Sequence, residues 1–429
     1  MDLPPVLRSE KGAIETIRKG VRKRNRSQIF LQTLGIGAIS FAFLMLAILL
    51  LSLTSTGYKA FVQTYLTLDV YVDPAEVSEE QLPRGGFDDV IEAALLQYFP
   101  EAGEDRATRR ALGGLPSNGA QFILRDKVAA DPSRIGETIR ISVPVSDPYD
   151  QLNKGLIDRE TPEQRRRVDN REVAWFDTLK EEGLIRTKLN WGLITRPDSR
   201  FPELAGLKGA LIGSFWALLV CFVISFPLGI GAAIYLEEFA PKNRVSDLIE
   251  VNINNLAAVP SVVFGLLALA VFLGWFGMPR SAPLVGGMTL SLMTMPTIII
   301  ATRAALKAVP PSIREAALGV GASKHQVVFG HVLPLAFPGI LTGTIIGLAQ
   351  ALGETAPLLL IGMNAFITSA PATPLDASTA LPTQIFIWAD SPERGFVSRT
   401  SAAILVLLSF LIVMNGLAIF LRNKFERKW

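Results

Sequence analysis

The chain has 429 residues, of which 49% are hydrophobic and 19% are charged. This composition is too apolar for an ordinary water-soluble protein of this size, so a membrane protein is the leading class. The charges are uneven, because residues 56–208 hold 21 of the 42 basic and 26 of the 39 acidic side chains. A uniformly soluble enzyme, a disordered chain and a bundle with only short loops are therefore excluded.

Six uncharged windows are long enough to cross a bilayer as helices. An α-helix needs roughly 20 apolar residues to cross about 30 Å of hydrocarbon, and a charge at the centre is costly. We predict transmembrane helices over residues 31–53, 209–234, 254–275, 283–301, 339–361 and 400–421. The first is interpreted as a retained anchor, because it is longer than the apolar part of a secretory signal.

The Lys and Arg bias of the short connecting segments orients these spans. Basic residues exceed acidic ones in the N-terminal segment 1–30, in the loop 302–338 and in the tail 422–429. The loop 235–253 gives no support, since it has two basic and four acidic residues. We therefore expect a multi-pass membrane protein with both termini in the cytoplasm. Parity then places residues 56–208 in the periplasm.

Residues 56–208 are predicted to form one α+β domain between the first two spans, which we call the insert. Apolar and polar residues alternate as in strands over 63–72 and 137–145, and helical patterns cover 87–98 and 162–184. Pro144 lacks a backbone donor, so it makes the second strand an edge strand. The insert has no His and no Cys, which argues against metal or thiol chemistry.

The loop 302–338 predicts a helix, a glycine turn and a second helix. Pro310 and Pro311 end the preceding span, and Ser312 offers an N-cap for a short helix over 313–318. Gly319 and Gly321 then allow a turn. A second short helix is expected from about residue 323 to 332, running to Pro334. An ordinary amphipathic connection between spans is the alternative.

This loop resembles the EAA signature of importer-type ABC permeases, whose cytoplasmic coupling helix docks on an ATPase subunit. The matching positions are Glu315, Ala316, Ala317, Gly321, Leu333 and Pro334. The resemblance implies that these residues contact the ATPase. Small alanines permit close approach, and Glu315 offers a carboxylate to basic groups. His331 departs from the pattern, because the family usually has an aliphatic residue there.

Segments 257–265, 352–357 and 384–389 resemble the PstA-type permeases of phosphate ABC importers, over about residues 209–429 plus the first span. The fold implied is an all-α polytopic membrane protein with six transmembrane helices. The permease domain would cover 209–421, with five of those helices, and the α+β insert would be an addition found in a subgroup. We interpret Trp275, Phe276 and Trp388 as residues at the membrane interface.

Glu354 is the only acidic residue inside a predicted span. Such a residue is expected to face the interior of a helix bundle or an aqueous path. Gly353 and Pro357 allow a local bend there. We predict that Glu354, Thr355, Ser261 and Gln350 line a translocation path, although Glu354 could instead be structural and Ser261 could mark only a kink. Many relatives have Arg at the positions of Gln350 and Ile300, so a partner could supply the cation that an anion requires.

The function implied by the resemblance is that of a non-enzymatic permease subunit of an ATP-driven phosphate importer. The expected partners are a separate ATPase that binds ATP and Mg²⁺, a second permease subunit, an extracytoplasmic phosphate-binding protein and membrane lipid. No nucleic-acid partner, catalytic residue, metal site or cofactor of this chain is expected. The alternatives are a permease for another oxyanion or small solute, and a membrane sensor with an extracytoplasmic ligand domain.

Overall fold

The computed structural model describes residues 5–78 and 85–425, with side chains for 21, 24–78, 85–420 and 422–424. Parts of the predicted basic segments 1–30 and 422–429 lie outside the described residues. The chain divides into two compact units, residues 1–55 and 56–429. Almost all of the first unit belongs to one helix, α1 (Pro5–Gly57). It contains the predicted span 31–53, and the stretch Arg24–Ala60 is apolar and long enough to cross a membrane.

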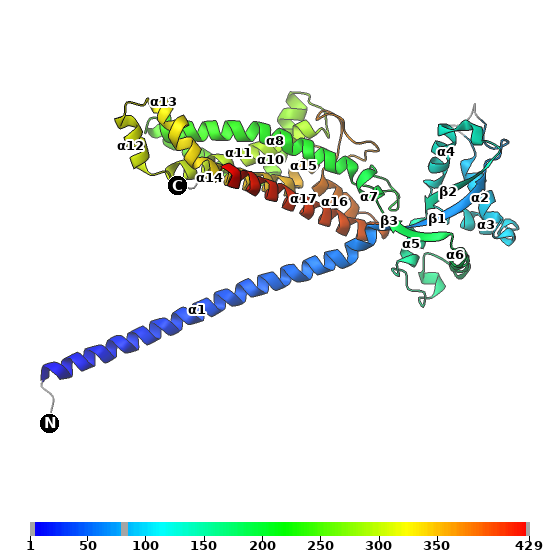
Figure 1. Cartoon of the computed structure of the whole chain (residues 1–429), viewed down its shortest axis with the longest axis horizontal. Coiled ribbons are helices and arrows are strands. Elements are labelled where there is room, and N and C mark those ends of the chain that lie inside the picture. Colours follow the sequence, from blue (N-terminus) through cyan, green and yellow to red (C-terminus); the bar gives the residue numbers. More distant parts are fainter. Residues whose placement is uncertain (1–4, 79–84, 426–429) are drawn as a thin grey trace. The chain divides into compact units, whose positions relative to one another are not determined.

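The insert contains a three-stranded antiparallel sheet with the strand order β2-β1-β3 (Figure 1). Its strands are β1 (Val62–Tyr71), β2 (Thr138–Pro144) and β3 (Ile185–Leu189). The strands β1 and β2 were predicted, and β2 is an edge strand that ends at Pro144, as expected. The strand β3 was not predicted, because four of its five residues are exposed and its sequence lacks an apolar alternation.

Among its described residues, the insert also contains six α-helices. They are α2 (Phe87–Leu96), α3 (Arg106–Gly113), α4 (Ala120–Ala130), α5 (Asp147–Asn153), α6 (Asn170–Glu181) and α7 (Gly192–Thr195). The helix predicted over 162–184 is wrong at its start. It begins at Asn170, because Asp169 and Glu172 form a capping box at that point.

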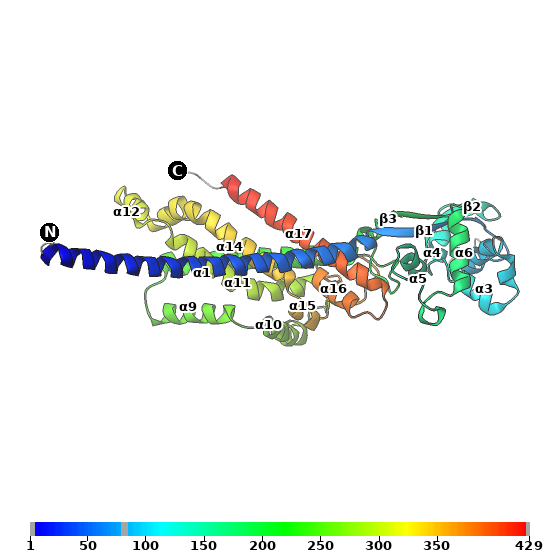
Figure 2. The same cartoon turned by 90° about the horizontal axis from the view of Figure 1, so that it is seen from below.

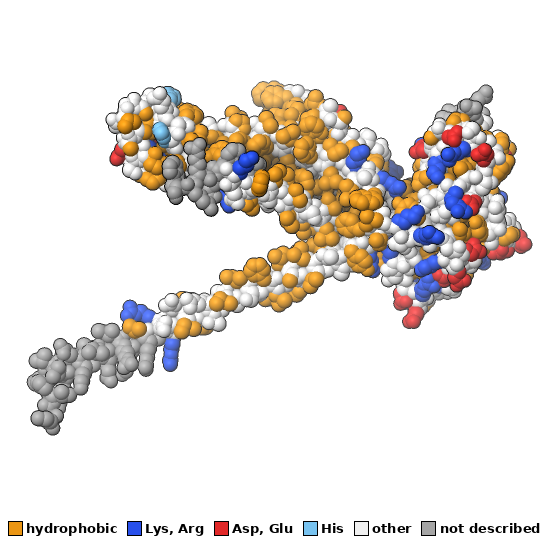
Figure 3. All heavy atoms as spheres, viewed as in Figure 1, with side chains coloured by type: hydrophobic (Ala, Val, Ile, Leu, Met, Phe, Trp, Pro, Cys, Tyr) orange, Lys and Arg blue, Asp and Glu red, His pale blue; other side chains and the backbone are white. Residues whose placement is uncertain are grey.

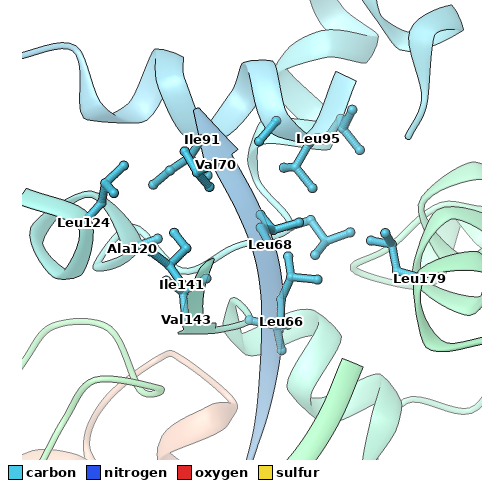
Figure 4. Close-up of a cluster of buried hydrophobic side chains, with 14 of the residues drawn as sticks. Leu66, Leu68, Val70, Ile91, Leu95, Ala120, Leu124, Ile141, Val143 and Leu179 are labelled. Atoms are coloured by element: carbon cyan, nitrogen blue, oxygen red, sulfur yellow. The ribbon is translucent and has the colours of Figure 1, made fainter. Parts of the chain in front are cut away.

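The core of the insert lies on one face of the sheet. The β1 side chains Leu66, Leu68 and Val70 are fully buried, since alternate residues of a strand point to the same side. Figure 4 shows them beside Ile141 and Val143 of β2 and facing residues of α2, α4 and α6. Burial of this kind stabilises a domain by about 25 cal/mol for each Å² of apolar surface removed from water. The insert therefore folds without the disulfide that its sequence cannot form.

The remaining chain is helical, and its longest helices run in roughly the same direction (Figures 1 and 2). The elements are α8 (Lys208–Ile234), η6 (Tyr235–Phe239), α9 (Arg244–Ala257), α10 (Ser261–Ala268), η7 (Leu269–Trp275), α11 (Pro283–Lys307), α12 (Pro311–Gly319), α13 (Lys324–Val327), η8 (Val328–Val332), α14 (Leu333–Gly353), α15 (Ala356–Leu360), α16 (Leu381–Ala389) and α17 (Gly395–Phe425). The segments η6, η7 and η8 are π-helical turns.

The described residues contain five helices that are long and apolar enough to cross a membrane, or six if one bent pair counts as a span. That pair is 244–257 and 261–275, and its two parts are bent by 99°. The straight helix predicted over 254–275 is therefore wrong. Pro260 has no backbone N–H and adopts an extended conformation, so the helix breaks there.

Small residues let the long helices approach closely. A Cβ atom on Gly287 of α11 would lie 2.5 Å from the backbone oxygen of Ala217 on α8, and one on Gly343 of α14 would lie 2.1 Å from Ala301. Such contacts replace the hydrophobic driving force that helices lack inside a lipid environment. On the face that Figure 3 shows, hydrophobic side chains, coloured orange, cover the helical part, and charged side chains gather on the insert.

Candidate coupling surface and membrane break

The segment between α11 and α14 has the predicted order of helix, glycine turn and helix. Gly321 has a φ of +89°, a conformation that glycine adopts without a Cβ clash. The predicted N-cap at Ser312 is wrong, because Pro310 is the N-cap residue and Pro311 occupies the first turn. Pro at this position costs nothing, since the first helical N–H groups have no intrahelical acceptor.

The second helix was predicted to end near Pro334, but it does not stop there. It continues through the π turn η8 into α14, so one helical stretch runs from Lys324 to Gly353. In η8 the N–H of Leu333 donates to the oxygen of Val328, five residues earlier. This shifted bonding accommodates the missing donor of Pro334 without a break. Pro334 is half-buried, as is Leu333.

The outward side of α12 carries what we call the coupling surface, composed of Glu315, Ala316, Leu318 and Val320. All four are exposed, with Leu318 at 53% and Val320 at 87%. No hydrogen bond or ion pair holds the Glu315 side chain within the described residues. Ala317, by contrast, points inward and is buried. Leu318 and Val320 are not among the residues predicted from the sequence, although two apolar residues beside a glycine turn were an available signal.

A salt bridge joins the first half of α12 to η6. Arg314 donates to Glu238 at 2.7 Å and to the backbone oxygens of Leu306 and Val309 at 2.9 and 2.8 Å. The Glu238 side chain is 9% exposed, so solvent screens this pair weakly. The inward face of α12 therefore has a fixed support, whereas its outward face has none.

A second cluster joins the same two loops. Arg303 bonds to Glu237 at 3.3 Å and to Glu250 at 2.9 Å, and Lys307 lies 3.6 Å from Glu237. These contacts explain the acidic loop 235–253, which did not fit the basic bias of the other predicted cytoplasmic segments. Its acids neutralise bases of the loop 302–338, with which it packs.

Glu354 lies between two helices and not inside one. The helix α14 ends at Gly353, Glu354 is extended with a ψ of 118°, and α15 begins at Ala356. We call residues 354–355 the membrane break. The helix predicted over 339–361 is therefore wrong at its C-terminal part, although the bend expected around Gly353 and Pro357 is present. Glu354 and Thr355 are both half-buried.

The structure brings α10 against α15, directly after the membrane break. A Cβ atom on Gly265 would lie 2.8 Å from the Cα atom of Pro357. Ser261, the half-buried first residue of α10, thus belongs to a segment that packs beside the break. Gln350 is exposed one turn earlier on α14. Within the described residues, no hydrogen bond or ion pair engages the side chains of Ser261, Gln350, Glu354 or Thr355.

The aromatic residues of the predicted membrane interface separate into two kinds. Trp275 is 80% exposed, as an interfacial residue would be, but Trp388 is 2% exposed. The Trp388 indole N–H donates to Asp198 Oδ1 at 3.0 Å, and Gln384 Nε2 donates to Oδ2 at 2.9 Å. The interfacial interpretation of Trp388 is therefore wrong. Together with Gln384, this side chain fixes the segment that precedes α8.

Comparisons with known proteins identify the helical part. The family model described as "Binding-protein-dependent transport system inner membrane component" matches residues 225–428, and "Domain of unknown function (DUF3333)" matches residues 18–163. The phosphate transport system permease protein PstA of Xylella fastidiosa (strain Temecula1) is 31% identical over 250 residues, which cover 58% of this chain and 85% of that protein. PstA of Yersinia pestis is 33% identical over 228 residues, covering 51% and 74%.

Other similarities are more partial. The probable ABC transporter permease protein YqgI of Bacillus subtilis is 32% identical over 174 residues, covering 40% of this chain and 58% of that protein. A structure of the MetNI methionine ABC transporter in an inward-facing conformation superposes with a TM-score of 0.40 at 16% identity, over 52% of this chain and 95% of that one. The alignments with the two PstA proteins cover 74% and 85% of their lengths at 33% and 31% identity. The chain therefore belongs to the PstA-type permeases, which are inner-membrane components of binding-protein-dependent transport systems and not enzymes.

Proposed function

We propose that this chain is the permease subunit of an ATP-driven importer of inorganic phosphate. The observation that carries the proposal is the 31% identity to a phosphate permease across 85% of that relative. The family match over residues 225–428 includes both the segment of the coupling surface and the segment of the membrane break. The chain then forms half of a transmembrane pathway.

The coupling surface is the proposed contact with a separate ATPase subunit, which binds ATP and Mg²⁺. Its chemistry supports this role, because Glu315 offers an unpaired carboxylate and Ala316 permits close approach. Leu318 and Val320 add exposed apolar area that a partner would bury. Ala317, Gly321, Leu333 and Pro334 shape the segment behind this surface.

The membrane break is the proposed part of the translocation path, with Ser261 and Gln350 beside it. An unpaired carboxylate repels phosphate, so Glu354 serves as a gate or as a partner for a cation and not as a direct ligand. The chain has Gln350 and Ile300 where many relatives have Arg. A second permease subunit would therefore supply the positive charge that an anion requires.

The orientation of the chain follows from the same proposal. The coupling surface and both termini face the cytoplasm, while the insert lies in the periplasm. An extracytoplasmic phosphate-binding protein delivers the substrate on that side. Closure of the ATPase subunits would move the coupling surface and switch the spans between outward and inward access.

Uptake of labelled phosphate tests the function directly. Cells that lack this chain are compared with cells that express it, with unlabelled arsenate, sulfate or molybdate as competitors. We expect uptake only in expressing cells and competition by arsenate, whose shape and charge resemble those of phosphate. Equal competition by sulfate, or uptake that does not depend on the chain, would overturn the substrate assignment.

A pull-down with the ATPase subunit tests the coupling surface. A valine at Gly321 is strained at a φ of +89°, so Gly321→Val should distort the turn and abolish co-purification. Gly319→Ala is the matched control, because Gly319 has ordinary backbone angles and no atom within 4 Å of an added Cβ. Unimpaired binding by the Val variant would contradict the assigned role.

A further inference from the structure

The insert is joined to the last span by a buried arginine. Arg399 lies in α17 and is 3% exposed. One of its terminal nitrogens donates to Gln63 Oε1 in β1 at 2.8 Å, and the other donates to the backbone oxygen of Ala205 at 2.7 Å. A single guanidinium therefore links both β1 and the C-terminal end of the insert to the start of α17.

Charged groups of both parts surround this arginine, and we call them together the Arg399 cluster. Arg167 of the insert donates to Asp147 at 3.1 Å and, across the junction, to Glu393 at 3.0 Å. Ser117 donates to Glu203 at 2.7 Å, and Asp150 accepts from the N–H of Thr64 at 3.0 Å. Asp147, Asp150 and Glu203 are all buried residues, and their carboxylates interact electrostatically with Arg399.

The two parts also touch through backbone. Gly395, the first residue of α17, leaves no room for a side chain, since an added Cβ would lie 1.9 Å from Asp147 Oδ1. The same atom would lie 2.7 Å from Pro202 Cβ. The insert therefore has no space to slide past the start of α17 while the cluster is intact.

Separating the insert from α17 would take from the buried Arg399 both of its hydrogen-bond acceptors and its neighbouring carboxylates, which is unfavourable. The insert is thus no freely tethered domain. The helix α17 in turn packs on α14, where Arg422 donates to Thr342 Oγ1 at 3.3 Å. The helix α14 connects the segment of the coupling surface with the membrane break. A displacement of the insert would therefore reach the helix that lies between the two candidate sites.

We propose that Arg399 is a positioning residue that makes the insert and α17 one rigid body, so that a protein bound to the insert moves α17 against α14. This inference rests on the proposed import function, in which a binding protein docks on the periplasmic side. It assigns to the insert a mechanical role in transport.

Distance measurements on the full chain in lipid nanodiscs test the rigid body. Spin labels are placed on Glu182→Cys in the insert and Leu375→Cys in the helical part, two exposed positions. The native Cys221 is buried and escapes labelling. We expect one narrow distance distribution, and a broad one when Gly395→Ala is added. Gly416→Ala is the matched control on the same helix, since it meets no atom within 4 Å. Equal widths in both variants would overturn the rigid body.

Transport tests the mechanical role separately. Arg399→Gln should lower initial uptake of labelled phosphate roughly fivefold at unchanged membrane level, whereas Arg394→Gln, an exposed neighbour, should not. If Arg399→Gln does not accumulate, Gly395→Ala serves the same purpose with the arginine intact. Broad distances with wild-type uptake would reduce the cluster to an anchor and overturn the proposal. If the unmodified chain imports no phosphate, the distance measurement still decides the rigid body, so the two failures remain distinguishable.

Discussion

Single residues decide which acids in this chain are structural and which are free to act. Asp198 accepts three hydrogen bonds, from Gln384, Trp388 and the N–H of Ser199. Glu354 and Glu315 accept none from the described residues. A carboxylate that is satisfied internally holds the fold together, whereas an unsatisfied one inside or beside the membrane is costly to keep. Glu354, which is half-buried and unpaired in the described residues, and Glu315 on the coupling surface therefore remain the proposed functional acids.

The substitution Glu354→Gln should impair transport but not assembly. Its side chain makes no hydrogen bond that the change would remove, so the fold has little to lose. The negative charge at the membrane break disappears, and we expect uptake to fall roughly tenfold, which corresponds to about 1.4 kcal/mol in the barrier. Uptake of labelled phosphate and co-purification with the ATPase are measured together. Asp390→Asn, at an exposed position after α16, is the control.

The substitution Asp198→Asn should change the pH dependence of stability. Burial raises the pKa of Asp198 above its ordinary value of 3.8. The folded protein therefore holds this proton more tightly than the unfolded chain does. The free energy of unfolding falls as the pH rises from 3.8 through the raised folded-state pKa. Asparagine carries no charge, and its amide can donate to Gln384 Oε1, which has no hydrogen-bond partner among the described residues.

The measurement for Asp198 is the melting temperature of both proteins in detergent from about pH 4 to about pH 8. We expect the advantage of the Asn variant to grow with pH. Other buried acids, such as Asp147 and Glu203, are present in both proteins and cancel in the comparison. An advantage that does not vary with pH would contradict the assignment.

At the scale of elements, one continuous helix connects the two candidate sites. The stretch Lys324–Gly353 has 30 residues and a length of about 45 Å at 1.5 Å per residue. It begins just after Gly321 and ends at the membrane break. Its π turn lets it pass Pro334 without interruption. In the proposed mechanism, movement at the coupling surface would reach Glu354 along this helix.

The substitution Arg314→Ala should loosen α12 from η6. It strands the nearly buried Glu238 and leaves the backbone oxygens of Leu306 and Val309 without this donor, at an expected cost of about 2 kcal/mol. Amide exchange across Pro311–Gly319 should then accelerate roughly thirtyfold. Arg244→Ala, at an exposed residue without an ion pair in the described structure, is the control. Unchanged exchange would show that other contacts hold α12.

At the scale of the whole molecule, the ion pairs between loops affect how well the charges of a loop predict its side of the membrane. Counted alone, the loop 235–253 gave no support to the expected orientation. Its contacts with Arg303, Lys307 and Arg314 place it on the same side as the loop 302–338. Acidic residues that are paired with bases carry little information about sidedness, because the positive-inside bias concerns Lys and Arg.

Cysteine labelling tests the proposed orientation. An impermeant maleimide added to intact spheroplasts should modify Glu182→Cys in the insert but should reach Val320→Cys, beside α12, only after permeabilisation. Both positions are exposed, and Cys221 is buried, so the background is low. Labelling of Val320→Cys from outside would reverse the topology and with it the docking side of the ATPase.

The sequence by itself determined the class of the protein, the polar insert, two of its three strands and the helix–turn–helix of the coupling segment. These features are local, because hydropathy, strand alternation and a glycine turn are written in neighbouring residues. Only the tertiary structure decided that Trp388 is buried against Asp198, that the acids of 235–253 pair with distant arginines, and that Arg399 joins the insert to α17. Each of these depends on residues separated by tens to hundreds of positions. A single sequence does not indicate which of its many polar groups will meet once the helices pack.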